Sequence, residues 1–404
     1  MELFLNLTAS AVMLALMALI ALRAWQELIQ GQTEPAAPER TLPGLRESTF
    51  VFAASLAVLW LGAYTGHVLS TDSFAGFGAH FLGRFTVEGD APRYLFMAEN
   101  GYVTEGEYVN NIVFYPLYPL LIRGVSVLLG GRMELAGILI SQLCYALAGV
   151  VLFRMACRLC RAPAAALFAF WLYPFGFFAL GVYTEGLFLL LSLACLSLLL
   201  RERWLGAGAA GLLCALTRSQ GMLLVLPGIY LAWRALRQGR RDPRMAAALA
   251  PLLGFFLYLC INKAVCGSFF AFTYYESQPP WWQTAQWVGK TVAQQWNMAF
   301  AYPGIARWIY WPQLALYFLA AVMLFLAWRR RQDNALTLYA TGYLGMCYTA
   351  SWLISGGRYM FGCVPLFLVV GNERRIWARR AFLAAELALF ILFNTYFMQG
   401  QCIM

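Results

Sequence analysis

Residues 3–22 read LFLNLTASAVMLALMALIAL, a run without a charged side chain. A helix of about 20 apolar residues is about 30 Å long, which is the thickness of the hydrocarbon core of a bilayer. The run follows Glu2 and ends at Arg23, and this charge order is the reverse of that in a secretory signal peptide. We therefore expect a retained membrane-spanning helix whose N-terminus lies outside.

Similar apolar runs recur along the whole chain, which is 61% hydrophobic and only 12% charged. Because a soluble domain carries about a quarter charged residues, this composition excludes a soluble enzyme, a disordered chain and a secreted disulfide scaffold. The net charge of +10 would indicate nucleic-acid binding in a soluble protein. Here we attribute it to membrane orientation and expect no nucleic-acid partner. Arginine far outnumbers lysine, which is typical of a GC-rich bacterial genome, so we expect a bacterial cytoplasmic (inner) membrane protein.

Most basic residues fall into six clusters between the apolar runs. We place all of them on the cytoplasmic side, because cytoplasmic loops are enriched in Lys and Arg. The chain must then cross the membrane an even number of times between successive clusters. This condition is met if residues 112–130 lie at the outer interface and do not span the membrane. The clusters are Arg23/Arg40/Arg46, Arg154/Arg158/Arg161, Arg201/Arg203, Arg234/Arg237/Arg240/Arg241/Arg244, Arg329–Arg331 and Arg374/Arg375/Arg379/Arg380. The pattern predicts an all-α polytopic membrane protein with about 12 transmembrane helices and both termini outside.

We expect a single transmembrane domain over residues 1–404. Residues 1–69 hold two N-terminal spans, and residues 70–133 form the first outer loop, with amphipathic helices at the interface. Residues 134–398 hold the remaining spans, which an outer loop interrupts at about 266–307. The longest polar stretch of the chain therefore lies on the outer face, where we expect the chemistry.

Two blocks stand out in the first outer loop: GDAPRYLFMAENGY at residues 89–102 and FYPLYPLL at residues 114–121. Apolar residues at helical spacing predict a short helix that begins near Asp90. An aspartate followed by Pro92 suits a helix start, so a helix cap alone can explain Asp90.

These blocks resemble the first luminal loop of the second mannosyltransferase of GPI-anchor synthesis and its bacterial relatives, the PIG-V-like family of GT-C glycosyltransferases. Further segments follow in the family's order: YTEGLF at 183–188, LTRSQG at 216–221, an outer loop with a late tryptophan at 267–282, and GRY at 357–359. The resemblance runs from about residue 80 to 370. One departure is Gly89, because the family usually has Trp before the aspartate.

The resemblance implies a GT-C-like bundle that moves a hexose, mannose in the named family, from a polyprenyl-phosphate carrier at the outer, periplasmic membrane face. It implies Asp90 as the catalytic base. Chemistry supports this assignment, because transfer with inversion needs a carboxylate to take the proton of the acceptor hydroxyl. The departing lipid phosphate needs cations, which Arg218 and Arg358 can supply, since the guanidinium fork matches phosphate oxygens. The acceptor remains open among a glycan, a lipid and a protein.

Further substrate-binding candidates are Arg93, Tyr94, Tyr102, Glu185 and Tyr359. Structural explanations stand beside these roles: an arginine at a helix end often extends to lipid headgroups. Glu185 can likewise act only as a helix cap, or it can orient one of the arginines.

We expect no metal and no cofactor besides the lipid-linked sugar, which is a donor substrate. The chain has two histidines and one isolated CxxC pair, Cys157 and Cys160, too few for a usual zinc site. The strongest rival function is a lipid-linked sugar transporter or flippase; transporters often show internal repeats, and none is obvious here. A non-catalytic assembly subunit would leave the outer-loop carboxylate and the arginines without a purpose.

Overall fold

The computed structural model of the chain describes residues 1–30, 42–401 and 403. The regular elements in this part are all helical, and the only strand-like pairing in it is one isolated bridge between Ala285 and Ala350. Six helical segments are long and apolar enough to cross a membrane. They are α1 (Glu2–Gln30), α2 (Leu45–Thr71), α6 (Met133–Leu159), η4 with α11 (Pro243–Leu249 and Ala250–Cys266), α15 (Tyr310–Arg329) and α19 (Ile376–Met398). The chain is therefore an all-helical, multi-pass membrane protein.

The other apolar runs form shorter helices that are interrupted by turns. Pro174 follows the end of α7, and Pro365 begins α18; proline lacks the N–H that would continue a preceding helix. These elements are α7 (Pro163–Trp171), η2 (Gly176–Leu180), α8 (Glu185–Leu199), α9 (Trp204–Ala215), η3 (Ser219–Leu224), α10 (Val225–Arg237), α16 (Asn334–Cys347), α17 (Gly356–Met360) and α18 (Pro365–Gly371). The interruptions place non-helical backbone and helix ends inside the protein, where polar side chains can converge.

Residues 70–133, the predicted first outer loop, contain the short helices expected there. The helix predicted to begin near Asp90 is α4, and residues 112–130 contain α5, whose 12 residues extend only about 18 Å and are too short to span. The elements are α3 (Phe77–Thr86), α4 (Ala91–Asn100), η1 (Val109–Val113) and α5 (Leu117–Leu128). The second predicted outer loop contains α12 (Ala271–Glu276), α13 (Val288–Ala301) and α14 (Pro303–Ala306).

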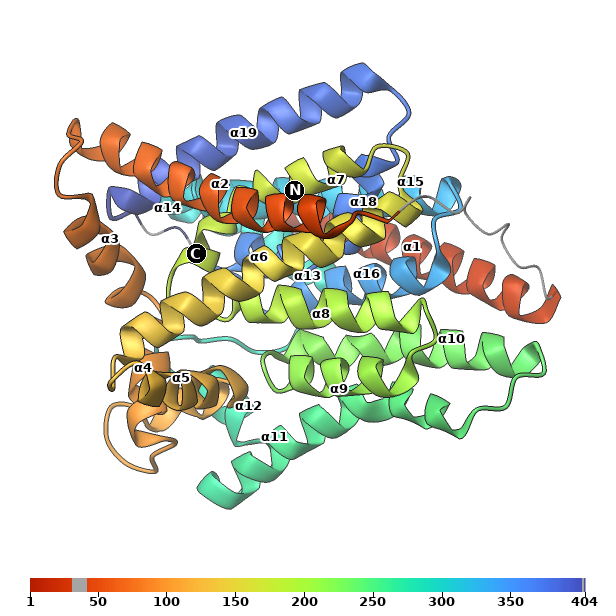
Figure 1. Cartoon of the computed structure of the whole chain (residues 1–404), viewed down its shortest axis with the longest axis horizontal. Coiled ribbons are helices and arrows are strands. Elements are labelled where there is room, and N and C mark those ends of the chain that lie inside the picture. The colour runs from red at the N-terminus through yellow and green to blue at the C-terminus, as the bar shows by residue number, and fades with distance from the viewer. Residues whose placement is uncertain (31–41, 402, 404) are drawn as a thin grey trace.

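The long helices run between two ends of the molecule (Figure 1). The helices α3, α4 and α5 gather at one end, and the C-terminal ends of α1 and α10 lie at the other. Close packing joins α6 to α8, because a side chain at Gly186 would overlap the carbonyl oxygen of Ser141. Small residues at helix contacts are typical of membrane proteins, where they let backbones approach closely.

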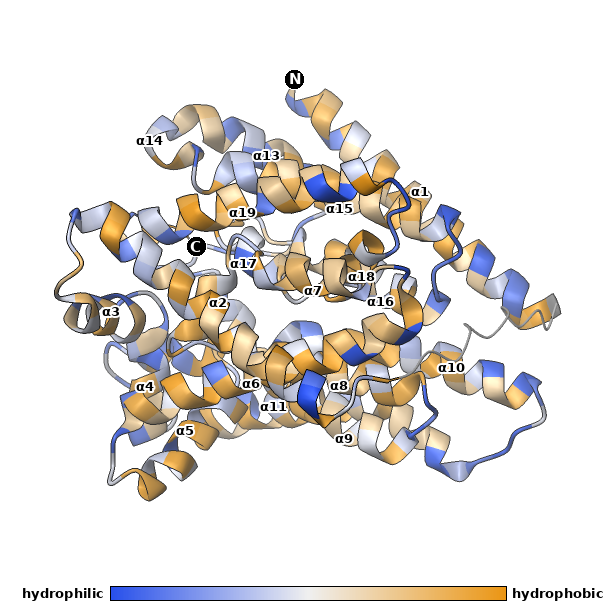
Figure 2. Ribbon diagram, turned by 45° about the horizontal axis from the view of Figure 1, so that its top comes forward, coloured by the Kyte–Doolittle hydropathy of each residue, from blue (hydrophilic) through white to orange (hydrophobic). Residues whose placement is uncertain are grey.

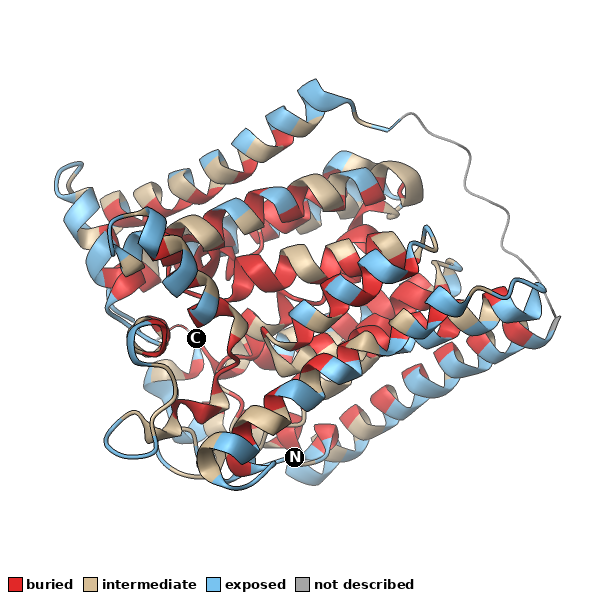
Figure 3. Ribbon diagram, turned by 60° about the horizontal axis from the view of Figure 1, so that its bottom comes forward, coloured by how far each residue is buried: buried red, intermediate tan, exposed pale blue. Residues whose placement is uncertain are grey.

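Hydrophobic residues occur along the outer helices as well as the central ones (Figure 2). Buried residues concentrate in the central helices, while the outer helices are exposed along one side (Figure 3). Leu61 on α2 and Phe256 on α11 are among the exposed large side chains, as expected for surfaces that face lipid.

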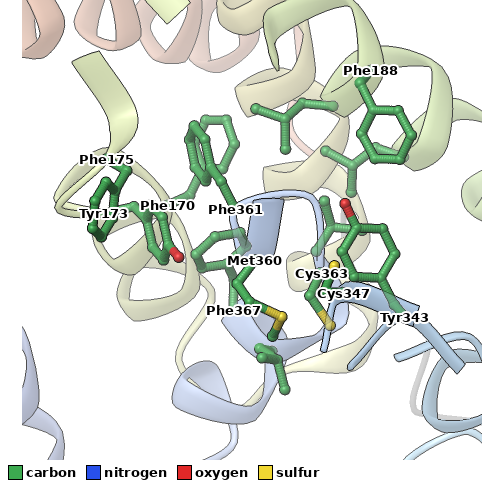
Figure 4. Close-up of a cluster of buried hydrophobic side chains, with 14 of the residues drawn as sticks. Phe170, Tyr173, Phe175, Phe188, Tyr343, Cys347, Met360, Phe361, Cys363 and Phe367 are labelled. Atoms are coloured by element: carbon green, nitrogen blue, oxygen red, sulfur yellow. The ribbon is translucent and has the colours of Figure 1, made fainter. Parts of the chain in front are cut away.

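A cluster of buried aromatic residues supports the turn between α17 and α18 (Figure 4). The rings of Tyr173 and Phe361 stack at 4.7 Å between centroids, and the Tyr173 hydroxyl donates to the carbonyl oxygen of Gly357 at 2.7 Å. A side chain at Gly362 would overlap the hydroxyl of Tyr343. The backbone on both sides of Arg358 is thus held by rigid packing.

Candidate active site

A cavity of about 430 Å³ lies at the end of the bundle that carries the first outer loop. Its wall includes residues of the α3–α4 turn, α4, the segment before α5, η3, the α12–α13 segment, α17 and the C-terminal residues. Six residues predicted from sequence lie in this wall: Asp90, Arg93, Tyr94, Arg218, Arg358 and Tyr359. They come from segments far apart in the chain, so the cavity exists only in the folded protein.

The Asp90 side chain does not cap α4. Asp90 occupies the N-cap position and Pro92 lies in the first turn, as predicted, but the carboxylate accepts no hydrogen bond from the helix N–H groups. Its Oδ2 instead accepts a hydrogen bond of 2.6 Å from Nη1 of Arg358. The side chain remains 29% exposed to the cavity side, so a substrate hydroxyl can reach it.

Gly89 is required by the backbone at this turn. Its φ of +64° lies in the left-handed region, which glycine adopts without steric cost. An added Cβ would lie 2.8 Å from the Tyr183 hydroxyl, which itself donates to the carbonyl oxygen of Glu88 at 2.9 Å. The space that a tryptophan would need before Asp90 is therefore occupied by Tyr183 in this chain.

Glu185 joins the two arginines beneath the cavity. It is the first residue of α8 and only 1% exposed. Its Oε1 accepts a hydrogen bond of 2.6 Å from Nη2 of Arg218 and another from Nε of Arg358. Glu185 is not among the residues of the cavity wall, and its carboxylate contacts the two arginines. Together with Asp90 it balances the two positive charges.

Aromatic rings fix the remaining faces of both guanidinium groups. The Arg358 guanidinium lies 4.7 Å from the ring centroid of Phe178 and 4.8 Å from that of Tyr183, and Arg218 lies 5.6 Å from that of Tyr359. In the described part of the chain, only Nη2 of the Arg218 side chain has a hydrogen-bond partner. The other Arg218 nitrogen atoms are therefore available to an anion in the cavity.

Residues 72–278 match the family described as mannosyltransferase (PIG-V). The chain belongs to this mannosyltransferase (PIG-V) family. The match confirms the family predicted from the outer-loop blocks and classes the chain with the glycosyltransferases. It includes Asp90, Glu185 and Arg218, and it ends before Arg358.

Curated relatives of this PIG-V family chain are GPI alpha-1,6-mannosyltransferases 2. The protein of Rattus norvegicus is 32% identical over 148 residues, which cover 34% of this chain and 29% of the relative. That of Cricetulus griseus is 34% identical over 151 residues, with the same coverage. The matched stretch therefore spans less than a third of the length of either relative.

Among solved structures, the chain is similar to the archaeal oligosaccharyltransferase AglB from Archaeoglobus fulgidus, which was solved in complex with an inhibitory peptide and a dolichol-phosphate. The TM-score is 0.40 at 13% sequence identity, over 86% of this chain and 56% of that chain.

Arg93 and Tyr94 of the family block lie on α4 and face different neighbours. Nη1 of Arg93 donates to Oδ1 of Asn110 at 2.7 Å and to Oδ1 of Asn111 at 2.8 Å. Its guanidinium lies 4.9 Å from the ring centroid of Trp281, which makes this tryptophan part of the cavity wall. Burial raises the pKa of the Tyr94 hydroxyl, so this group is a hydrogen-bond donor and not a base.

The structure does not bring Tyr102 to the cavity. Its hydroxyl donates to the carbonyl oxygen of Phe114 at 2.7 Å and so ties the end of α4 to the start of the proline-rich block. Gly101, with a φ of +75°, ends α4 and turns the chain away before Tyr102. Tyr102 therefore positions the loop, while Arg93 and Tyr94 reach the cavity.

Glu276 also lines the cavity, although the sequence analysis does not identify it as a site candidate. It ends α12, and burial raises the pKa of its carboxyl to about 7. Its sequence signal is that it is the one acidic residue between 266 and 307. Tyr183, Ser219 and Gln283 also line the cavity and were not singled out.

Within the described residues, no group of three or more His, Cys, Asp or Glu side chains is arranged to hold a metal ion. The groups that the cavity offers for chemistry are the Asp90 carboxylate, a second carboxyl at Glu276, the two oriented guanidinium groups and an aromatic wall.

Proposed function

We propose that this chain is an integral-membrane mannosyltransferase that moves a hexose from a polyprenyl-phosphate carrier to an acceptor hydroxyl with inversion. The observation that carries the proposal is the Asp90 carboxylate, which faces a cavity beside Arg218 and Arg358. Family membership supports mannose as the sugar. The acceptor is a glycan, a lipid or a protein.

Asp90 is the general base in this proposal. Its Oδ1 takes the proton of the acceptor hydroxyl while the hydroxyl oxygen bonds to the anomeric carbon. The bond between that carbon and the phosphate oxygen breaks, and its electron pair leaves with the lipid phosphate. The hydrogen bond from Arg358 to Oδ2 fixes the carboxylate in the cavity wall, so the base is in position before the acceptor arrives.

The two arginines stabilise the leaving phosphate. A sugar phosphodiester carries one negative charge and the phosphomonoester that leaves carries up to two, so cations favour the transition state. Arg218 supplies the unoccupied N–H groups, and Glu185 holds its guanidinium in place. Preorganised donors of this kind avoid the cost of reorienting groups during the reaction.

We further propose twelve crossings, with the Asp90 cavity facing the periplasm of a bacterial cytoplasmic membrane. Arginines from five of the six sequence clusters line one cavity at the end of the bundle away from Asp90. That separation of charge supports the cytoplasmic assignment of the basic end.

The test uses purified protein in proteoliposomes with polyprenyl-phosphate mannose carrying a labelled sugar. Asp90→Asn is expected to reduce transfer about 10²- to 10⁴-fold, the usual contribution of a general base. Glu99→Gln is the matched control, because Glu99 is an exposed carboxylate on the same helix that lies outside the cavity wall. Full transfer by a folded Asp90→Asn protein would refute the mechanism. Movement of the labelled lipid across the bilayer without a new glycosidic bond would instead favour a flippase.

A further inference from the structure

A second cavity, of about 630 Å³, lies at the other end of the bundle; we call it the basic cavity. Eight arginines and two carboxylates, Glu27 and Asp333, line it. The helix α8 begins at Glu185 beneath the Asp90 site, and Arg201, just beyond its end, lies in the wall of the basic cavity. The 15 residues of α8 separate the two sites by roughly 20 Å.

Within the described residues, neither carboxylate forms an ion pair with an arginine of this wall. Glu27 accepts from Arg23 at 3.2 Å and from the Tyr230 hydroxyl at 2.6 Å, and Asp333 caps α16 by accepting from the N–H of Ala335. Arg240 and Arg330 pair with Glu202 and Glu373, which lie outside the cavity wall. The other six arginines of the wall have no carboxylate of the described residues within ion-pair distance: Arg158, Arg161, Arg201, Arg234, Arg331 and Arg374.

Membrane orientation alone does not explain why these arginines surround a cavity. Membrane orientation is satisfied by arginines on open surface, such as Arg237 and Arg241, which are exposed and outside the wall. Here like charges from five loops surround one concave space, and repulsion from Arg158 adds to burial in lowering the pKa of Arg201. A cleft lined by one sign of charge focuses the field on whatever enters it.

Hydrogen-bonding groups in the wall also lack partners. The Nη1 atom of Arg330 and the Nε2 atom of Gln332 are buried, and neither has a hydrogen-bond partner in the described part of the chain. Buried donors are nearly always paired in folded proteins, so unpaired ones indicate an unassigned partner. A multivalent oxyanion can accept hydrogen bonds from the accessible guanidinium groups of the wall.

We propose that the basic cavity binds a phosphate-bearing ligand at the end of the protein away from Asp90. Arginine forks match phosphate oxygens, and the volume suits a small phosphorylated molecule or a phospholipid headgroup. The shared chemistry is the phosphate group, and a lipid and a soluble polyphosphate are its two possible sources. The inference is independent of the proposed transferase activity.

The full-length protein in nanodiscs provides the test. One arm adds inorganic pyrophosphate to phosphatidylcholine nanodiscs, and the other replaces a fifth of the lipid with phosphatidylglycerol; thermal unfolding and titration are measured in both. Arg158→Gln with Arg201→Gln is expected to weaken binding of the effective probe at least tenfold. Arg237→Gln with Arg241→Gln is the matched control, since it removes the same charge from the same end, and it is expected to change binding less than twofold.

Stabilisation by pyrophosphate identifies a soluble ligand, and stabilisation by phosphatidylglycerol alone identifies a lipid headgroup. Either result supports the site if the cavity variant abolishes the stabilisation and the control variant does not. The second cavity variant, Arg161→Gln with Arg374→Gln, must reproduce the loss even if the first is poorly folded. No stabilisation by either probe, or an equal loss in the control, would overturn the proposal.

Discussion

Replacing Glu185 by Gln tests how the Asp90 site is held together. Gln keeps the size of the side chain and an oxygen acceptor, but it removes the charge shared by Arg218 and Arg358. The site then has two buried guanidinium groups facing the single carboxylate of Asp90. The side chains of Glu185, Arg358 and Arg218 are 1%, 6% and 11% exposed, so water screens this imbalance weakly.

Breaking a buried ion pair by removing one partner costs about 3–5 kcal/mol of folding free energy. We expect Glu185→Gln to lose stability in this range and also to raise KM for the lipid donor, because the arginines are no longer oriented. The control is Glu88→Gln, which removes an ion pair with Arg84 in which the glutamate is 49% exposed. The Arg84 side chain is 9% exposed, but water screens the Glu88 carboxylate, so we expect a smaller loss of stability from Glu88→Gln than from Glu185→Gln.

Thermal unfolding in detergent, followed by tryptophan fluorescence, measures the difference between the two variants. Adding Arg218→Met to Glu185→Gln restores the charge balance and is expected to recover part of the lost stability, since removing both members of a buried pair is often nearly neutral. The reasoning is wrong if Glu185→Gln is no less stable than Glu88→Gln, or if the second substitution adds a further full loss.

Three other substitutions test separate parts of the site. Gly89→Ala is expected to reduce transfer and to lower the free energy of unfolding by about 1–2 kcal/mol, because it places a side chain at φ +64° against Tyr183. Wild-type values in both assays would contradict the turn geometry. The pKa of Glu276 is raised to about 7, so between about pH 4.5 and 7 the folded protein keeps this proton while the unfolded chain releases it. The free energy of unfolding is therefore expected to fall by about 3 kcal/mol as the pH rises through this range. Unfolding of Glu276→Gln, measured over the same range, should not show this decrease. Tyr102→Phe is expected to lower the free energy of unfolding by about 1 kcal/mol without changing KM. A rise in KM without a loss of stability would instead indicate that Tyr102 contacts the substrate.

The membrane fold follows from sequence because apolar length is a local property. Residues 3–22 contain enough information for a spanning helix, and α1 covers them. The short helix α4 follows equally from the spacing around Asp90 and Pro92. A local pattern does not show where the chain turns after a helix ends, so the sequence does not reveal that Tyr102, which follows the turn at Gly101, lies outside the cavity wall.

The convergence of Asp90, Arg218 and Arg358 was reached by chemical reasoning together with a family resemblance, because a leaving phosphate needs cations wherever they lie in sequence. The shared position of Glu185 between both arginines follows only from the fold. Glu276 was missed for a related reason: its unusual pKa comes from burial by segments distant in sequence, and no neighbouring residue signals it.

The hydrogen bond between Asp90 and Arg358 joins residues 268 positions apart. During synthesis, the aspartate enters the membrane region long before its arginine partner has been made. The cavity wall also includes Gln401, close to the last described residue. A nascent chain that ends before α17 thus lacks one of the two guanidinium groups of the proposed site, and this site is complete only after α17 has been made.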